Sequence, residues 1–287
     1  MEQSLIIKNV NKIFPQFTLQ NIHMEVPEGT IMGFVGENGA GKTTTIQCIL
    51  NLLKLDDGEI EVLGRKHTDP VLKDDIGVVF DENNYFDTMN IQQINKMMLK
   101  IYKNWHADEF FEMCHSRFAL PEDKLIKDFS RGMHMKLAIA MALSHEAKLL
   151  ILDEPTSGLD PVTRDEILDI FLDFVQDEHH SILLSSHIST DIEKIADYIT
   201  YIHEGSVIFS KSKDELLENF GIMRCSKNQA SLIDEEDIIA KLEHDYSVDI
   251  LVDHKDKMEK KYKDIIMDKP SIDDIMLLYA KGERKVC

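Results

Sequence analysis

Hydrophobic and polar residues follow two different patterns along this chain. Short apolar runs bounded by turn residues predict buried strands of a parallel sheet, and between them apolar residues recur at helical spacing. The predicted strands are 31–35, 76–80, 149–152, 181–184 and 198–202, and the helices among them are 45–53, 167–175 and 188–196. Strands that alternate with helices indicate an α/β fold with a mostly parallel sheet and right-handed crossovers.

Two segments in the first half of the chain depart from this alternation. The N-terminal runs at 5–10, 17–19 and 22–26 alternate between apolar and polar residues, and predict an antiparallel β subdomain that ends at a Pro-Glu-Gly turn. From Met89 to about His145 the spacing is helical, and we therefore predict a helical insertion over about 86–147.

The pattern changes again near residue 210, so we predict a main domain over 1–210 and a small extension over 211–287. In the extension, residues 214–220 form a predicted helix, and residues 221–267 are weakly patterned. Ser271 and Asp274 are placed to cap a final helix that ends at Ala280.

The residues 36–44, G-E-N-G-A-G-K-T-T, fit the phosphate-loop pattern G-x-x-x-x-G-K-[ST]. They lie between a predicted strand and a predicted helix, as that loop requires. Glycines let backbone N–H groups close around phosphate oxygens, and the helix N-terminus adds positive potential. Lys42 is placed to reach the β- and γ-phosphates, and Thr43 to hold Mg²⁺. The predicted nucleotide-binding residues here are Gly36, Glu37, Asn38, Gly39, Ala40, Gly41, Lys42, Thr43 and Thr44.

Two carboxylates follow the strand predicted at 149–152. Because the carboxyl ends of parallel strands lie beside the phosphate loop in such sheets, Asp153 is expected to bind Mg²⁺ or its waters. Glu154 is expected to polarise an attacking water. The alternative, a pair of solvated acids after a core strand, is disfavoured by the phosphate loop.

With these residues in place, residues 5–210 resemble the nucleotide-binding subunit of an ATP-binding cassette (ABC) transporter. The resemblance implies a P-loop NTPase cassette in which Glu154 and His187 are catalytic and Phe14 stacks on adenine. It also implies that the signature residues bind the γ-phosphate held by a second subunit, and that the loop after Glu154 contacts that subunit. The signature residues are Ser130, Arg131 and Gly132, and the loop residues are Ser157, Gly158, Leu159 and Asp160.

Two positions depart from the family's motifs. The signature is usually Leu-Ser-Gly-Gly-Gln, and here Arg131 replaces a glycine and adds a charge. The loop that leads into the helical insertion usually carries Gln, and here the aligned residue is Asp81. A carboxylate still offers an oxygen to Mg²⁺. The predicted metal ligands are therefore Thr43, Asp81 and Asp153.

Composition narrows the class of partner. The formal charge of −20 repels nucleic acid, and no apolar run reaches the length that spans a bilayer. The first residues lack the basic region of a signal peptide. The four scattered cysteines include no C-x-x-C pair, so reduced thiols are expected and zinc is not. We expect a cytoplasmic chain, peripheral on the inner face of the cell membrane.

The resemblance implies an ATPase that uses ATP and Mg²⁺. It would dimerise head to tail, as a homodimer or with a paralogue, and drive a separate transmembrane permease subunit near residues 81–86. A soluble cassette ATPase of translation or repair, a binding-only regulator and an importer ATPase are the alternatives. The segments 80–82, 129–133 and 269–276 resemble the small-exporter branch linked to GntR-type regulators, which implies export of amphipathic peptides or antibiotics, as for phenol-soluble modulins.

Overall fold

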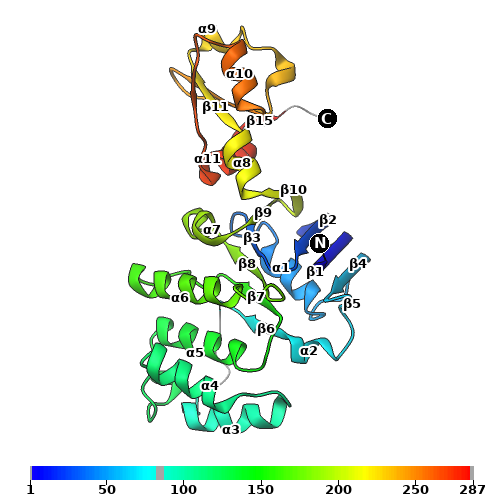
Figure 1. The fold of residues 1–287 in the computed structure, drawn as a ribbon. Helices are drawn as coiled ribbons and strands as arrows, with labels where there is room; N and C mark the ends of the chain where they lie inside the picture. Colours follow the sequence, from blue (N-terminus) through cyan, green and yellow to red (C-terminus); the bar gives the residue numbers. More distant parts are fainter. Residues whose placement is uncertain (1, 82–86, 285–287) are drawn as a thin grey trace.

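The computed structural model describes residues 2–81 and 87–284. Figure 1 shows two lobes of unequal size, with helices α3–α5 at one end of the larger lobe and the C-terminal unit at the opposite end of the molecule. The larger lobe holds two β-sheets and the helices that cover them, and we call it the cassette. The smaller lobe begins after the last cassette strand, β10.

The N-terminal sheet has four antiparallel strands in the order β2-β1-β4-β5. Its strands are β1 (Gln3–Phe14), β2 (Phe17–Pro27), β4 (Asp57–Val62) and β5 (Arg65–Lys66). The antiparallel prediction is confirmed, although the two short runs expected at 17–19 and 22–26 form the single strand β2. Alternate residues such as Leu5, Ile7 and Met24 are fully buried in one hydrophobic cluster with Ile46 of α1 (Lys42–Ile49).

The central sheet has six strands in the order β10-β9-β3-β8-β7-β6, and only β10 is antiparallel to its neighbour. The apolar runs form its strands as predicted, and every residue of β3 and β7 is buried. The strands are β3 (Ile31–Val35), β6 (Ile76–Val79), β7 (Leu149–Asp153), β8 (Ser181–Ser186), β9 (Tyr198–His203) and β10 (Ser206–Ser212). Three further cassette helices are α2 (Leu72–Asp75), α6 (Pro161–Phe174) and α7 (Ser189–Ile195).

The predicted insertion between β6 and β7 is helical. It contains α3 (Ile91–Ile101), α4 (Ala107–Glu112), a π-helical turn (Met113–Arg117), a 3₁₀ turn (Ile126–Asp128) and α5 (Arg131–Leu143). Asn90 and Gln93 form a capping box that begins α3. Trp105, the single tryptophan of the chain, is 7% exposed and donates a hydrogen bond to Asn95.

The stretch 221–267, which the sequence patterns weakly, belongs to a five-stranded antiparallel sheet in the order β14-β11-β13-β12-β15. Buried residues on one face of this sheet, such as Met223 and Ile250, form a separate cluster with Met258 of α10. The elements of this lobe are α8 (Lys213–Asn219), β11 (Gly221–Cys225), α9 (Lys227–Ala230), a 3₁₀ turn (Glu235–Asp237), β12 (Ala240–Glu243), β13 (Val248–Val252), α10 (Lys255–Lys261), β14 (Ile266–Asp268), α11 (Ile272–Lys281) and β15 (Glu283–Arg284).

Helix α11 joins this lobe to the cassette. The capping box predicted from Ser271 and Asp274 is present. Ile272 and Ile275 are fully buried in the cluster that includes the core of the central sheet. The backbone N–H of Ile272 also donates to Glu193 of α7 over 2.6 Å. The apolar stripe of this helix therefore packs between the cassette and strands β12 and β13 of its own lobe.

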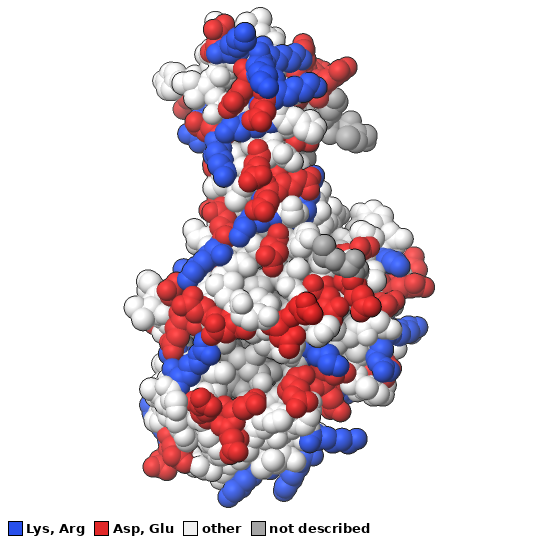
Figure 2. All heavy atoms as spheres, viewed as in Figure 1, with Lys and Arg blue, Asp and Glu red and all other residues white. Residues whose placement is uncertain are grey.

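Charge is spread unevenly over the surface. Figure 2 shows acidic side chains across the cassette and a group of Lys and Arg side chains near the tip of the smaller lobe. Residues 211–287 contain 14 Lys and Arg against 18 Asp and Glu, a balance of −4 out of −20, so most of the negative charge belongs to the cassette. Among the helices that the structure describes, none combines the length and the apolar composition needed to cross a bilayer.

Candidate functional site

The loop between β3 and α1 has the backbone that its glycines predict. Gly39 and Gly41 have φ angles of +83° and +115°, in the region that side chains other than hydrogen disfavour. A Cβ on Gly36 would lie 2.4 Å from the carbonyl oxygen of Ile202, and one on Gly41 would lie 2.6 Å from Leu19. The tight curve of this loop therefore depends on glycine for both conformation and space.

Lys42 begins α1, and its amine is held within the curve of the loop. Its Nζ donates to the carbonyl oxygens of Gly36 at 2.7 Å and Glu37 at 3.3 Å. It also forms an ion pair with Glu154 Oε1 at 3.2 Å, without hydrogen-bond geometry, because that oxygen is buried with no hydrogen-bond partner among the described residues. The side chain of Lys42 is only 6% exposed, so its charge lies in a little-hydrated setting.

The end of β7 meets the start of α1 at Asp153. The Thr43 hydroxyl donates to Asp153 Oδ2 over 2.8 Å, and the Ser185 hydroxyl donates to Oδ1 over 2.6 Å. Asp153 is 3% exposed. A hydroxyl and a carboxylate in contact are the oxygen donors that suit Mg²⁺, so these two residues fit the predicted ion.

Glu154 is held by its backbone and by its side chain. Its φ of +54° is uncommon for a residue with a side chain, and its N–H lies within hydrogen-bond distance of both the carbonyl oxygen and the hydroxyl of Ser185. Its Oε2 contacts His187 Nδ1 at 2.6 Å. Glu154 therefore bridges His187 and Lys42 through its two carboxylate oxygens.

The sheet order explains this convergence. Strands β3, β8 and β7 are neighbours and parallel, so the segments that follow them meet at one edge. Lys42, His187 and Glu154 each follow a different one of these strands. Sequence analysis did not single out Ser185, although it contacts both acids. The available signal was its place directly before Ser186 and His187 at the end of a buried strand.

Phe14 ends β1 and lies near the phosphate loop through a second ring. Its ring centroid is 6.5 Å from that of Phe17, and Phe17 lies against Gly41. Lys12 Nζ lies 5.6 Å from the centre of the Phe14 ring. The predicted aromatic contact for adenine therefore stands beside the loop, next to a second aromatic residue.

The signature residues begin α5. Ser130 is the N-cap, and its hydroxyl accepts from the N–H of Met133 at 3.3 Å. Arg131 donates to Asp81 Oδ1 over 2.5 Å. Among the hydrogen bonds and ion pairs of the described residues, none joins Ser130, Arg131 or Gly132 to the phosphate loop of the same chain. The two departures from the family's motifs thus contact each other.

The loop after Glu154 connects the residues around the phosphate loop with the signature residues. Leu159 is buried, and Asp160 caps α6 by accepting from the N–H groups of Val162 and Thr163. These bonds, that from Thr163 first, lower the pKa of the Asp160 carboxyl below its usual value. Gly158, with a φ of +69°, lies against the guanidinium of Arg131.

Asp81 has Arg131 as its partner, and its contact with Mg²⁺ stays a prediction. The rest of the segment predicted to meet a permease, residues 82–86, lies outside the described residues. Cys48, Cys114 and Cys225 are buried free thiols, and burial raises the pKa of Cys114 to about 12. In the described parts of the chain, no group of three or more His, Cys, Asp or Glu side chains is arranged to hold a metal.

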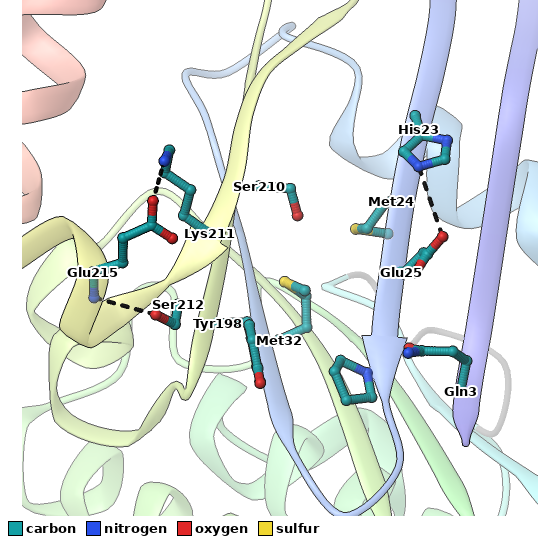
Figure 3. Close-up of a pocket in the computed structure, with 11 residues that line it drawn as sticks. Gln3, His23, Met24, Glu25, Met32, Tyr198, Ser210, Lys211, Ser212 and Glu215 are labelled. Atoms are coloured by element: carbon teal, nitrogen blue, oxygen red, sulfur yellow. Dashed lines mark hydrogen bonds and ion pairs between the residues drawn. The ribbon is translucent and has the colours of Figure 1, made fainter. Parts of the chain in front are cut away.

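A cavity of about 520 Å³ lies away from this site, at the base of the smaller lobe. Figure 3 shows His23 and Glu25 of β2 on one side of it and Ser210, Lys211 and Glu215 on the other. None of the predicted catalytic or nucleotide-binding residues lines it.

Known proteins are similar to this chain in sequence and in fold. The family model described as ABC transporter matches residues 19–157. The chain is 33% identical over 258 residues to the bacitracin transport ATP-binding protein BcrA of Bacillus licheniformis, covering 85% of this chain and 82% of that protein. It is 32% identical to the lantibiotic transport ATP-binding protein SrtF of Streptococcus pyogenes, covering 73% of this chain and 91% of that protein.

Solved structures of other proteins have a similar fold. The structure of cbiO1 from Clostridium perfringens, part of the transporter complex cbiONQ, matches with a TM-score of 0.64 and 25% identity, covering 75% of this chain and 91% of that one. A cassette dimer with ADP and phosphate has the same fold, with a TM-score of 0.64 and 21% identity over 72% of this chain and 98% of that one. The recognition from motifs and the predicted P-loop fold are confirmed. This chain belongs to the ABC transporter family, as an ATPase subunit with an ATP-binding cassette.

Proposed function

We propose that this chain hydrolyses ATP at the edge where β3, β7 and β8 end, and that two such sites form between two chains. The observation that carries the proposal is the contact of Glu154 with both Lys42 and His187, at 3.2 Å and 2.6 Å. A phosphate-binding amine, a carboxylate base and an orienting imidazole therefore meet at one point.

Thr43 and Asp153 would hold Mg²⁺, with Asp81 as a further predicted ligand. When bound, the ion neutralises charge on the phosphate oxygens. Ser185 fixes the Asp153 carboxylate from the side opposite Thr43, so the orientation of that carboxylate does not depend on the ligand.

Glu154 would accept the proton of the attacking water. Its carboxylate is 13% exposed, and a base with little hydration needs less solvent reorganisation when it takes a proton. His187 donates to one oxygen of this carboxylate, and Lys42 neutralises the other. When Lys42 turns to the phosphates, Glu154 Oε1 becomes available to the water.

A second chain would complete each site. Ser130 and Arg131 are exposed at the start of α5, where the helix N-terminus favours an anion. Since their contacts in the described residues do not reach their own phosphate loop, the phosphate they would bind belongs to another chain. The loop from Ser157 to Asp160 would lie between the two cassettes.

The printed names of the relatives support the rest of the proposal. Several are ATP-binding proteins for bacitracin or lantibiotic transport, so we propose that this chain drives export of amphipathic peptides or antibiotics. A separate permease would hold the chain on the inner face of the membrane. An importer ATPase remains the alternative, and a binding-only role is disfavoured by the Glu154–His187 contact.

The test is Glu154→Gln, with Glu146→Gln as the matched control. Both glutamates have a positive φ and contact a histidine, but Glu146 is 64% exposed and pairs with His106. ATP hydrolysis by Glu154→Gln is expected to fall by about 10²-fold or more, with ATP binding retained. Hydrolysis by Glu146→Gln should match the parent. Equal hydrolysis rates for all three chains would overturn the proposal.

A further inference from the structure

The Arg131–Asp81 contact joins segments that the fold otherwise keeps apart. Asp81 follows β6 at the edge of the central sheet, and Arg131 is the first residue of α5 in the helical insertion. Their side chains meet at 2.5 Å. A Cβ built on Gly158 would lie 2.9 Å from Arg131 Nη1, so the guanidinium also covers the loop after Glu154. One side chain of α5 therefore contacts two further segments that border the proposed site.

The position of Arg131 in its helix calls for an anion. A cation at a helix N-terminus is unfavourable because the backbone dipole is positive there, and the first turn of α5 contains no acidic residue. Asp81 supplies the compensating charge from outside the helix. The pair is not sealed from solvent, since the two side chains are 51% and 41% exposed. A second anion that approaches the start of α5 can therefore reach the same guanidinium.

A triphosphate is a stronger ligand for this group than a carboxylate. Guanidinium binds phosphate oxygens bidentately, and the phosphates carry several negative charges where Asp81 carries one. In the proposed dimer, which this inference takes as its basis, Ser130 and Gly132 flank Arg131 and face the nucleotide of the second chain. Asp81 and that nucleotide would thus compete for Arg131.

We propose that Arg131 exchanges partners when the dimer closes, from Asp81 of its own chain to the γ-phosphate held by the other chain. In the free chain Asp81 holds the guanidinium against Gly158, and this raises the ATP concentration needed for closure. Closure releases Asp81 at the sheet edge beside β7. The exchange couples the helical insertion to the segment after β6.

The existence of the pair is tested first, without nucleotide. Asp81→Asn is expected to lower the melting temperature by about 1–3 °C, as loss of an exposed ion pair does. Arg131→Gln should lower it by less, because it also removes a cation from the helix N-terminus. The double variant should melt no lower than the single variants, because each removes the same interaction. Additive losses would show that the pair contributes nothing and would overturn the proposal.

The exchange is then tested through dimerisation, in a Glu154→Gln background with ATP and EDTA, so that neither turnover nor a metal contributes. Dimer dissociation constants are measured by sedimentation velocity. Asp81→Asn should lower this constant about two- to five-fold, because Arg131 loses its competing partner. Arg131→Gln should raise it about tenfold or more, because a charge-assisted contact is lost. Adding Asp81→Asn to Arg131→Gln should change nothing further.

The Arg117–Asp173 pair is the control. It has the same 2.5 Å distance and comparable exposure of 40% and 65%, and in the described parts of the chain no hydrogen bond or ion pair joins it to the proposed site. Arg117→Gln and Asp173→Asn should leave the dissociation constant unchanged. The exchange is overturned if Asp81→Asn leaves the dissociation constant unchanged or raises it. It is also overturned if Asp81→Asn lowers the constant as much in the Arg131→Gln variant as in the parent. In either case the proposed function stands. A background chain that stays monomeric with ATP would overturn both.

Discussion

Two groups of charged side chains, one in each lobe, show how differently the same residue types behave. In the cassette, Lys42 and Glu154 are 6% and 13% exposed and 112 positions apart in sequence. In the smaller lobe, Lys261 contacts Asp234 and Asp237 at 2.6 Å each. Asp237 is 13% exposed, as Glu154 is, but Lys261 and Asp234 are 42% and 65% exposed. The lesson is that distance alone does not mark a functional cluster. Burial, long sequence separation and a strained backbone distinguish the cassette group.

The group around Lys261 in the smaller lobe, which we call the surface group, contributes modestly to stability. Exposed ion pairs contribute about 0–1 kcal/mol because water and salt screen them. The cassette group is costly to hold without a ligand, since charged groups with little hydration need partners at every polar atom. Glu154 Oε1, which accepts no hydrogen bond from the described residues, belongs to the cassette group.

The largest effect expected concerns whether the lobes unfold together. Ile275→Ala removes a fully buried side chain from the cluster that α11 shares with the cassette, and should lower the free energy of unfolding by about 2–5 kcal/mol. Trp105 fluorescence reports the cassette, and its transition should shift. Ile250 lies in the cluster confined to the smaller lobe. Ile250→Ala should therefore lower the unfolding midpoint measured by circular dichroism and leave the midpoint measured by Trp105 fluorescence unchanged. Equal shifts of the Trp105 transition in the two variants would show that the cluster around Ile250 does not unfold separately from the cluster around Ile275.

A middle-sized effect is expected inside the cassette group. Ser185→Ala should reduce ATP turnover about 10–100-fold, because the hydroxyl that orients Asp153 is lost. Ser181→Ala is the control, since Ser181 is equally buried at the other end of β8 and its hydroxyl contacts Ser4. Both variants should lose about 1 kcal/mol of stability. Turnover that falls alike in both would show a general loss of packing.

The smallest effect concerns pH in the surface group. Hydrogen bonds from Lys261 and Tyr262 lower the pKa of Asp237. A carboxyl with a lowered pKa stabilises the fold above its unfolded value of about 3.9, and this contribution is lost as the pH falls through the folded value. Asp237→Asn should therefore melt below the parent at pH 7, with the gap closing as the pH falls below about 3.9 and through the folded pKa. A gap that persists in acid would assign the loss to packing.

Sequence analysis reached the features that are local. The phosphate loop is nine consecutive residues, and Asp153 and Glu154 end an apolar run, so their places in the fold could be predicted without knowing what lies beside them. Contacts across the fold could not be predicted in this way. Ser185 meets Asp153 across 32 positions and Arg131 meets Asp81 across 50, and both depend on the order of strands in the sheet.

The sheet of the smaller lobe escaped prediction for a different reason. Its strands β12 and β14 have four and three residues, too few for alternation to be distinguished from chance. The sheet forms because neighbouring strands and helices α9, α10 and α11 cover it. The final helix, by contrast, has ten residues and a complete capping box, and it was predicted within one residue.

The left-handed backbone of Glu154 has a consequence for variants that arise by chance. A side chain at a φ of +54° costs on the order of 1 kcal/mol, and the cost is smaller for Gly or Asn. A change from Glu154 to glycine or asparagine would relieve this strain, but it would also remove the carboxylate that pairs with the little-hydrated amine of Lys42. The relief of backbone strain would offset part of that loss, so a chain without the predicted base could still fold and persist in a cell. Protein abundance would report nothing about activity, and an idle subunit would still occupy its place in an assembly.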